Sequence, residues 1–167
     1  SQEEIYGNSV DHPYLSSKEK AFSLSCRCEI PTIFIYFCSV IQTKPMTLTE
    51  ETLRFISEHR KDDVRSLALQ ARKYPSVDVP AAIIQIAGRR TAEEKIPTWA
   101  KREGILYPAH LSMEQCSSEA TARYKAGIVT AAGDGNRTTF TDLTGGFGID
   151  CAFLSACFEH ATYVERQ

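Results

Sequence analysis

The sequence predicts a helical domain followed by the start of an α/β sheet. Residues 46–126 carry helix-starting residues ahead of apolar positions at helical spacing. Residues 138–167 contain a strand, a glycine-rich turn, a helix and a second strand that ends in the carboxylate of Glu165. This order is typical of the first β-α-β of a Rossmann-like nucleotide-binding sheet.

Helix-capping residues mark the helices that we expect in residues 46–126. The expected starts are, in order, Thr49, Asp62 or Asp63, Asp78 with Pro80, Pro97, and Ser112 or Glu114. The first helix should turn Leu53, Phe55 and Ile56 inward, and Gly88 should be a weak point in the third. The last helix should run to Ala126. Its basic residues and those of the other helices are scattered, which favours solvated faces over a phosphate-binding face.

The second part should be joined to the helices by a glycine-rich hinge at residues 127–137. We expect a short buried strand over Thr138–Leu143, a turn over Thr144–Gly148 and a helix over Ile149–His160. A second strand over Ala161–Glu165 would then pair with the first. Only these two strands of a sheet are expected.

The chain has 167 residues, 43% apolar residues and a net charge of −2, which is ordinary for a globular protein. Nucleic-acid binding would therefore need a local basic patch. Residues 1–45 differ in composition, and we expect them to be a non-native upstream or disordered segment with Met46 as the biological start. The apolar run Ile30–Ile41 is too short to span a bilayer, so we expect a cytoplasmic protein without membrane contact. The four histidines share no metal-binding spacing, so no metal is expected.

The residues around the glycines indicate the kind of ligand. Glycines allow the backbone to approach a ligand closely, and an acid at the end of the next strand can accept hydrogen bonds from ribose hydroxyls. The dinucleotide pattern would need a small residue where Cys151 stands, and Asp142 precedes the glycines. An acid at that place suits a cationic ligand such as S-adenosylmethionine. An ordinary glycine turn between a strand and a helix remains the alternative.

Three blocks together resemble a known family. Glu114–Ala126, Asp142–Asp150 and Tyr163–Gln167 look like the bacterial class I S-adenosylmethionine-dependent methyltransferases that have a helical N-terminal domain and a THUMP-like C-terminal domain. The resemblance runs from Met46 to the end of the chain. This family is similar in turn to RNA methyltransferases, so the resemblance implies RNA as the partner.

The resemblance also implies where S-adenosylmethionine would bind. The expected cofactor-binding residues are Asp142, Thr144, Gly145, Gly146, Gly148 and Glu165, with Gln115, Ser118 and Thr121 in the helix before them. Thr144 departs from the family, since it stands where the commoner motif has a glycine.

The family's sheet has seven strands, and its catalytic Asp-Pro-Pro or Asn-Pro-Pro motif is absent from the sequence. We therefore expect an N-terminal fragment that does not catalyse methyl transfer alone and whose catalytic residues are unknown. A fragment of an NAD(P)-dependent oxidoreductase and a non-enzymatic, helical nucleic-acid-binding module remain alternatives. The sequence does not indicate the oligomeric state.

Overall fold

The computed structural model describes the backbone of residues 8–9, 19–25, 48–132 and 137–166, and the side chains of residues 48–132 and 137–165. The chain divides into two compact units. We call Lys44–Gln115 the helical unit, and Ser1–Thr43 together with Cys116–Gln167 the sheet unit. The division falls after Gln115, whereas the sequence predicted a helical domain that extends to Ala126.

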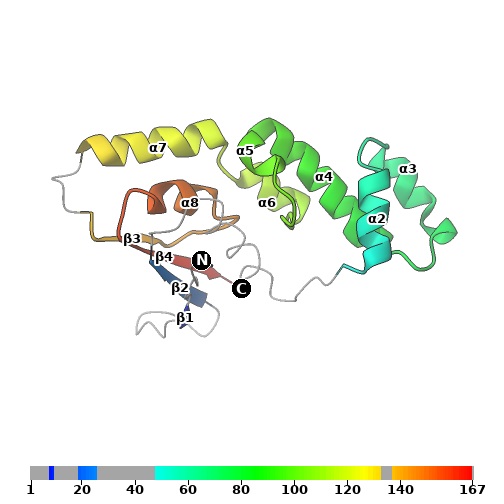
Figure 1. Cartoon of the computed structure of the whole chain (residues 1–167), viewed down its shortest axis with the longest axis horizontal. Coiled ribbons are helices and arrows are strands. Elements are labelled where there is room, and N and C mark those ends of the chain that lie inside the picture. Colours follow the sequence, from blue (N-terminus) through cyan, green and yellow to red (C-terminus); the bar gives the residue numbers. More distant parts are fainter. Residues whose placement is uncertain (1–7, 10–18, 26–47, 133–136, 167) are drawn as a thin grey trace, which may run out of the picture. The chain divides into compact units, whose positions relative to one another are not determined.

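The helical unit is built from short helices around one longer one (Figure 1). They are α2 (Glu50–Glu58), α3 (Val64–Leu69), the 3-10 helix η1 (Ala71–Lys73), α4 (Val79–Lys95), α5 (Pro97–Ala100) and α6 (His110–Gln115). The expected caps at Thr49, Asp63 and Asp78 are confirmed, because each side chain accepts a backbone N–H of its helix's first turn. Among the described residues, no helix combines the length and apolarity needed to cross a bilayer.

The apolar faces of α2, α3 and α4 meet in one core. Phe55, Leu67, Ala82 and Ile86 are buried there. Leu53 was expected to point inward with Phe55, but its side chain is 51% exposed. The difference arises because Leu53 precedes Phe55 by two positions, which turns it away from the face that Phe55 buries.

Gly88 lies inside α4 and does not interrupt it, so the expected weak point is wrong. A methyl group at this position would overlap the side chain of Tyr107. The absence of a side chain therefore lets the loop before α6 lie directly on α4. Gln85 secures the same contact, since its amide nitrogen donates to the Tyr107 carbonyl at 3.0 Å and its amide oxygen accepts the Tyr107 N–H at 2.8 Å.

The last helix predicted from the sequence is two helices. α6 ends at Gln115, and α7 (Glu119–Ala132) starts after a break in which Ser118 is the cap. Residues 127–132, expected to be a hinge, continue α7, while residues 133–136 lie outside the described residues. Gly127 is tolerated because one glycine between good helix formers costs only about 1 kcal/mol.

The described residues of the sheet unit form a four-stranded sheet, whereas two strands were expected. Its strands are β1 (Asn8–Ser9), β2 (Glu19–Ser25), β3 (Thr139–Asp142) and β4 (His160–Arg166), in the order β1-β2-β4-β3. The predicted parallel pair is present as β3 and β4. β2 pairs antiparallel with β4, although it comes from the segment that we expected to be non-native or disordered.

α8 (Ile149–Ser155) connects β3 to β4 and packs against α7 (Figure 1). It ends earlier than the predicted helix, because His160 already belongs to β4, where its N–H donates to the Thr138 carbonyl. β3 was expected to be buried, yet its residues alternate between exposed and half-buried. Successive side chains point to opposite faces of the sheet, which explains the alternation, and β3 is an edge strand of the described sheet, which explains why none of them is fully buried.

Replacing the two helical glycines by alanine should have opposite effects. Gly88→Ala should lower the free energy of unfolding by roughly 1–3 kcal/mol, because the new methyl group overlaps Tyr107. Gly127→Ala should raise it by roughly 0.5–1 kcal/mol, because the space around Gly127 is open. Urea denaturation of both variants measures the difference. A Gly88→Ala protein at least as stable as the parent would contradict the close approach of Tyr107.

Candidate functional site

The glycine turn that connects β3 to α8 lies at the carboxyl ends of the parallel strands β3 and β4. Asp142 is the last residue of β3, and its register partner on β4 is Tyr163. Glu165 follows two residues later on the same strand. The two predicted acids therefore end neighbouring strands, with the turn between them, which is where open parallel sheets bind ligands.

Tyr163 on β4 packs against the glycine turn. Its side chain is fully buried, and its hydroxyl donates to the Gly146 carbonyl at 2.6 Å. A side chain at Gly145 would overlap the tyrosine ring. The Gly145 N–H also donates to the Val164 carbonyl at 3.0 Å. Gly145 is thus required by close packing, and these two hydrogen bonds connect the turn to β4.

The turn itself depends on two glycines with positive φ. Gly146 has φ of 52° and Gly148 has φ of 81°, conformations that other residues rarely adopt. Phe147 lies between them and is buried, so its side chain anchors the turn in the core. The Gly148 N–H donates to the Gly145 carbonyl at 2.7 Å. These contacts make the turn a defined structure in the absence of any ligand.

Glu165 takes part in the turn. Its Oε2 accepts the Gly146 N–H at 2.6 Å. The sequence predicted this carboxylate as a ribose acceptor, and the structure places it against the backbone of the predicted binding loop. The hydrogen bond crosses from the end of β4 to the turn, so a ligand that engages Glu165 would also act on the geometry of Gly146.

The surroundings of Asp142 disfavour the ionised form of its carboxyl group. Partial burial raises the pKa of its carboxyl above the ordinary 3.8, and the negative charges of Asp150 and Glu165 raise it further. Its Oδ1 accepts the Thr144 N–H at 3.0 Å, which opposes the shift. No salt bridge to Asp142 or Glu165 is present among the described side chains. Among the described side chains, the site therefore has an excess of negative charge.

Sequence reasoning missed a polar cluster next to the turn, made by Asp150, Lys125 and Ser117. Asp150 Oδ2 accepts the Lys125 ammonium at 2.6 Å and the Ser117 hydroxyl at 2.8 Å. Its other carboxylate oxygen is buried without a partner among the described residues. The only signal in the sequence was an acid in the first turn of a helix, where it is favoured by the helix dipole. Its partners come from a distant part of the chain.

Three further residues were predicted to contact the methionine end of the cofactor. Ser118 and Thr121 bond to each other, because the Thr121 N–H donates to the Ser118 hydroxyl at 3.1 Å and the two hydroxyl oxygens are 2.9 Å apart. They cap α7, and no hydrogen bond between described residues connects them to the glycine turn. Gln115 is the exposed last residue of α6 and belongs to the helical unit.

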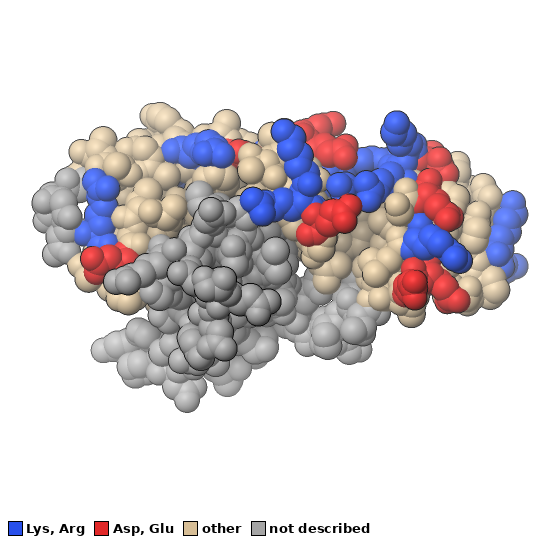
Figure 2. Space-filling model, viewed as in Figure 1, with Lys and Arg blue, Asp and Glu red and all other residues tan. Residues whose placement is uncertain are grey.

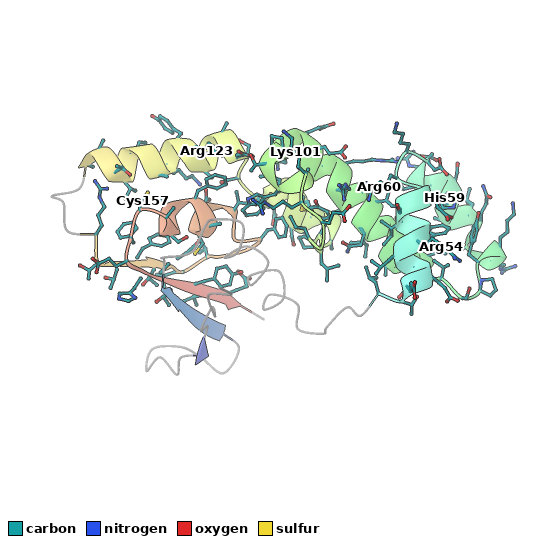
Figure 3. All side chains as sticks on the ribbon, in the orientation of Figure 1. Arg54, His59, Arg60, Lys101, Arg123 and Cys157 are labelled. Atoms are coloured by element: carbon teal, nitrogen blue, oxygen red, sulfur yellow. The ribbon has the colours of Figure 1, made fainter. Side chains whose placement is uncertain are left out.

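α7 and α8 are held together beside this site. The Arg123 guanidinium lies 4.8 Å from the centre of the Phe153 ring, and it forms an ion pair with the mostly buried Glu119 at 2.7 Å. Figure 3 labels Arg123 between the two helices. This contact fixes α8, and with it the end of the glycine turn.

No group of three or more histidine, cysteine or acidic side chains that could hold a metal ion occurs in the described part of the chain. Comparison of the whole sequence with protein-family models and with curated proteins, and of the fold with solved structures, finds no match.

Two aspartate substitutions should change stability in opposite directions. The pKa of Asp142 is raised in the folded protein. The stability that Asp142 contributes is therefore fully present below pH 3.8 and is lost as the pH rises through the folded pKa. Asp142→Asn should therefore be more stable than the parent at neutral pH, and the gain should shrink as the pH falls toward 3.8. Urea denaturation over this pH range measures the gain.

Asp63→Asn is the matched control. Hydrogen bonds from the Ser66 N–H and hydroxyl lower the pKa of Asp63, so its contribution is present above pH 3.8 and is lost as the pH falls through the folded pKa. This variant should be less stable than the parent at neutral pH. If Asp142→Asn were also less stable than the parent at neutral pH, the claim that folding disfavours the ionised Asp142 carboxylate would be wrong.

Proposed function

We propose that the glycine turn binds S-adenosylmethionine and that the chain is part of a class I methyltransferase that acts on RNA. The observation that carries the proposal is the pair of carboxylates, Asp142 and Glu165, on either side of a glycine turn at the ends of two parallel strands. The described residues supply neither with a salt bridge, and the pKa of Asp142 is raised. A positively charged nucleoside would complement this charge.

The groups of S-adenosylmethionine fit the donors and acceptors at the site. Its sulfonium and α-amino cations would lie toward Asp142, and its ribose hydroxyls would hydrogen-bond to Glu165. Gly146 presents exposed backbone without a side chain, which allows close approach. When bound, the cofactor supplies an electrophilic methyl group. Asp142, Glu165 and the turn would hold and orient it, and we assign no residue to the methyl acceptor.

One feature of the sheet departs from a Rossmann-like arrangement. In the usual order 3-2-1-4-5-6, the second strand has a parallel neighbour on its outer side. Here that neighbour of β4 is the antiparallel β2. The β-α-β unit formed by β3, α8 and β4 is therefore the part of the sheet that supports the proposed cofactor site.

RNA enters the proposal through the family resemblance. Figure 2 shows the Lys and Arg side chains of the helical unit interspersed with Asp and Glu on the visible face. Basic side chains that alternate with acids would neutralise few phosphates, so the affinity for a nucleic acid should fall only modestly with added salt. A steep dependence on salt, with no S-adenosylmethionine binding, would favour the non-enzymatic nucleic-acid-binding alternative.

Calorimetric titration tests the cofactor site. We expect saturable binding of S-adenosylmethionine and no binding of NADH. Asp142→Asn and Glu165→Gln should each weaken binding by about 10–100-fold, since a hydrogen bond to a charged group contributes about 1.5–3 kcal/mol. Because Asp142→Asn is expected to be more stable than the parent, weaker binding would not reflect unfolding.

Glu159→Gln is the matched control, since Glu159 is an exposed acid of the same unit and its position precedes β4. Its affinity should equal that of the parent. Absence of S-adenosylmethionine binding by the folded parent protein would overturn the proposal, and tighter binding of NADH would favour the oxidoreductase alternative.

A further inference from the structure

The helical unit contains a half-open cavity of about 310 Å³ that is separate from the glycine turn. It lies among residues of α2, α4 and the loop at residues 103–107. Its volume is at the small end of the range of about 300–1,000 Å³ for ligand pockets. This size suits a small molecule and is too small for a helix or a dinucleotide.

The walls of the cavity are held in place without a ligand. The loop at residues 103–107 is fixed on α4 by the two hydrogen bonds between Gln85 and Tyr107 and by the side-chain-free surface of Gly88. Gly104 has φ of 80°, which allows the loop to turn there. A cavity with such fixed walls loses little conformational entropy when it binds a ligand.

One part of the lining is apolar. Leu53, Ile56 and Leu106 line the cavity, and Leu53 is among the exposed large hydrophobic residues of the chain. A half-exposed leucine at a cavity is unfavourable in water and favourable against an apolar ligand. Leu53, which is turned away from the face that Phe55 buries, therefore contributes apolar surface to this cavity.

The cationic groups of the lining are Arg60 and Arg89. Arg89 is held by a hydrogen bond to the Ala100 carbonyl at 3.0 Å and by Glu93 at 3.8 Å. Arg90 fixes the backbone of Arg60, since its guanidinium donates to the Arg60 carbonyl at 2.7 Å. Figure 3 labels Arg60 beside α4, in agreement with this contact.

The Arg60 guanidinium has no hydrogen-bond or ion-pair partner among the described side chains and backbone, so its donors are available to a ligand. The described lining contains one acid, Glu103, and two arginines, of which Arg89 is already paired with Glu93, so Arg60 is the cation that can pair with a ligand. An arginine fork matches a carboxylate in shape and charge.

We propose that this cavity binds a small organic carboxylate with an apolar body. The carboxylate would pair with Arg60, and the apolar body would cover Leu53, Ile56 and Leu106. Inorganic phosphate lacks the apolar body, and a neutral alcohol of the same length lacks the charge. Each is therefore expected to bind more weakly than the carboxylate.

Octanoate is a suitable probe for the full chain. We expect saturable binding with one site, measured by calorimetry and by NMR shifts confined to α2, the middle of α4 and residues 103–107. Octan-1-ol and inorganic phosphate should each bind at least about tenfold more weakly, as expected when either the charged hydrogen bonds or the apolar contacts are lost. An octan-1-ol affinity equal to that of octanoate, stronger phosphate binding or no octanoate binding would overturn the proposal.

Two variants test whether Arg60 and Leu53 contribute to octanoate binding. Arg60→Gln and Leu53→Gln should each reduce octanoate affinity by about tenfold, and neither should unfold the protein, because both side chains are exposed. Arg54→Gln is the matched control: Arg54 is on α2, its side chain is 73% exposed, and it pairs with Glu58, and neither residue lines the cavity. Equal loss in Arg54→Gln and Arg60→Gln, with all variants folded, would show non-specific attraction and would overturn the site.

Discussion

The close packing of the Tyr163 ring against the backbone of Gly145 is the constraint on which the candidate cofactor site depends. Because residue 145 has no side chain, the ring lies directly under the turn and its hydroxyl reaches the Gly146 carbonyl. Through this contact β4 determines the position of the turn. The same strand supplies Glu165, so the loop and one of its two flanking acids are positioned by a single element. Asp142, at the end of the parallel neighbour, completes the arrangement.

The helical unit uses a similar contact for a different loop. Tyr107 packs on Gly88 as Tyr163 packs on Gly145. In both cases a buried tyrosine contacts a glycine backbone, and this contact holds a loop against a helix or a strand. In the sheet unit the fixed loop is the glycine turn. In the helical unit it is one wall of the cavity. Each proposed binding surface is therefore formed by packing within the chain.

Helix caps and the order of elements around Asp142 were predicted, whereas several helix ends and the contacts between distant residues were not. The caps at Thr49, Asp63 and Asp78 are recognisable because a cap and its helix are adjacent in the sequence. The strand, turn and helix around Asp142 follow from residue spacing for the same reason. The pairing of β2 with β4 was missed because an antiparallel partner can come from any part of the chain, and Glu19–Ser25 lacks a strong apolar pattern. The Asp150–Lys125 contact joins separate helices and was invisible for the same reason. Gly88 shows a further limit, since spacing alone does not tell a helix-weakening glycine from one that allows close packing.

The antiparallel attachment of β2 has a consequence for how the sheet can grow. A strand has two hydrogen-bonding edges, and those of β4 are occupied by β3 and β2. Any additional strand must therefore either join an open edge of the described sheet, beside β3 or beside β1, or displace β2. The second route exchanges one ladder of hydrogen bonds for another of similar strength, so the two partners would compete for β4. While β2 is in place, it shields β4 from recruitment by the edge of another protein molecule.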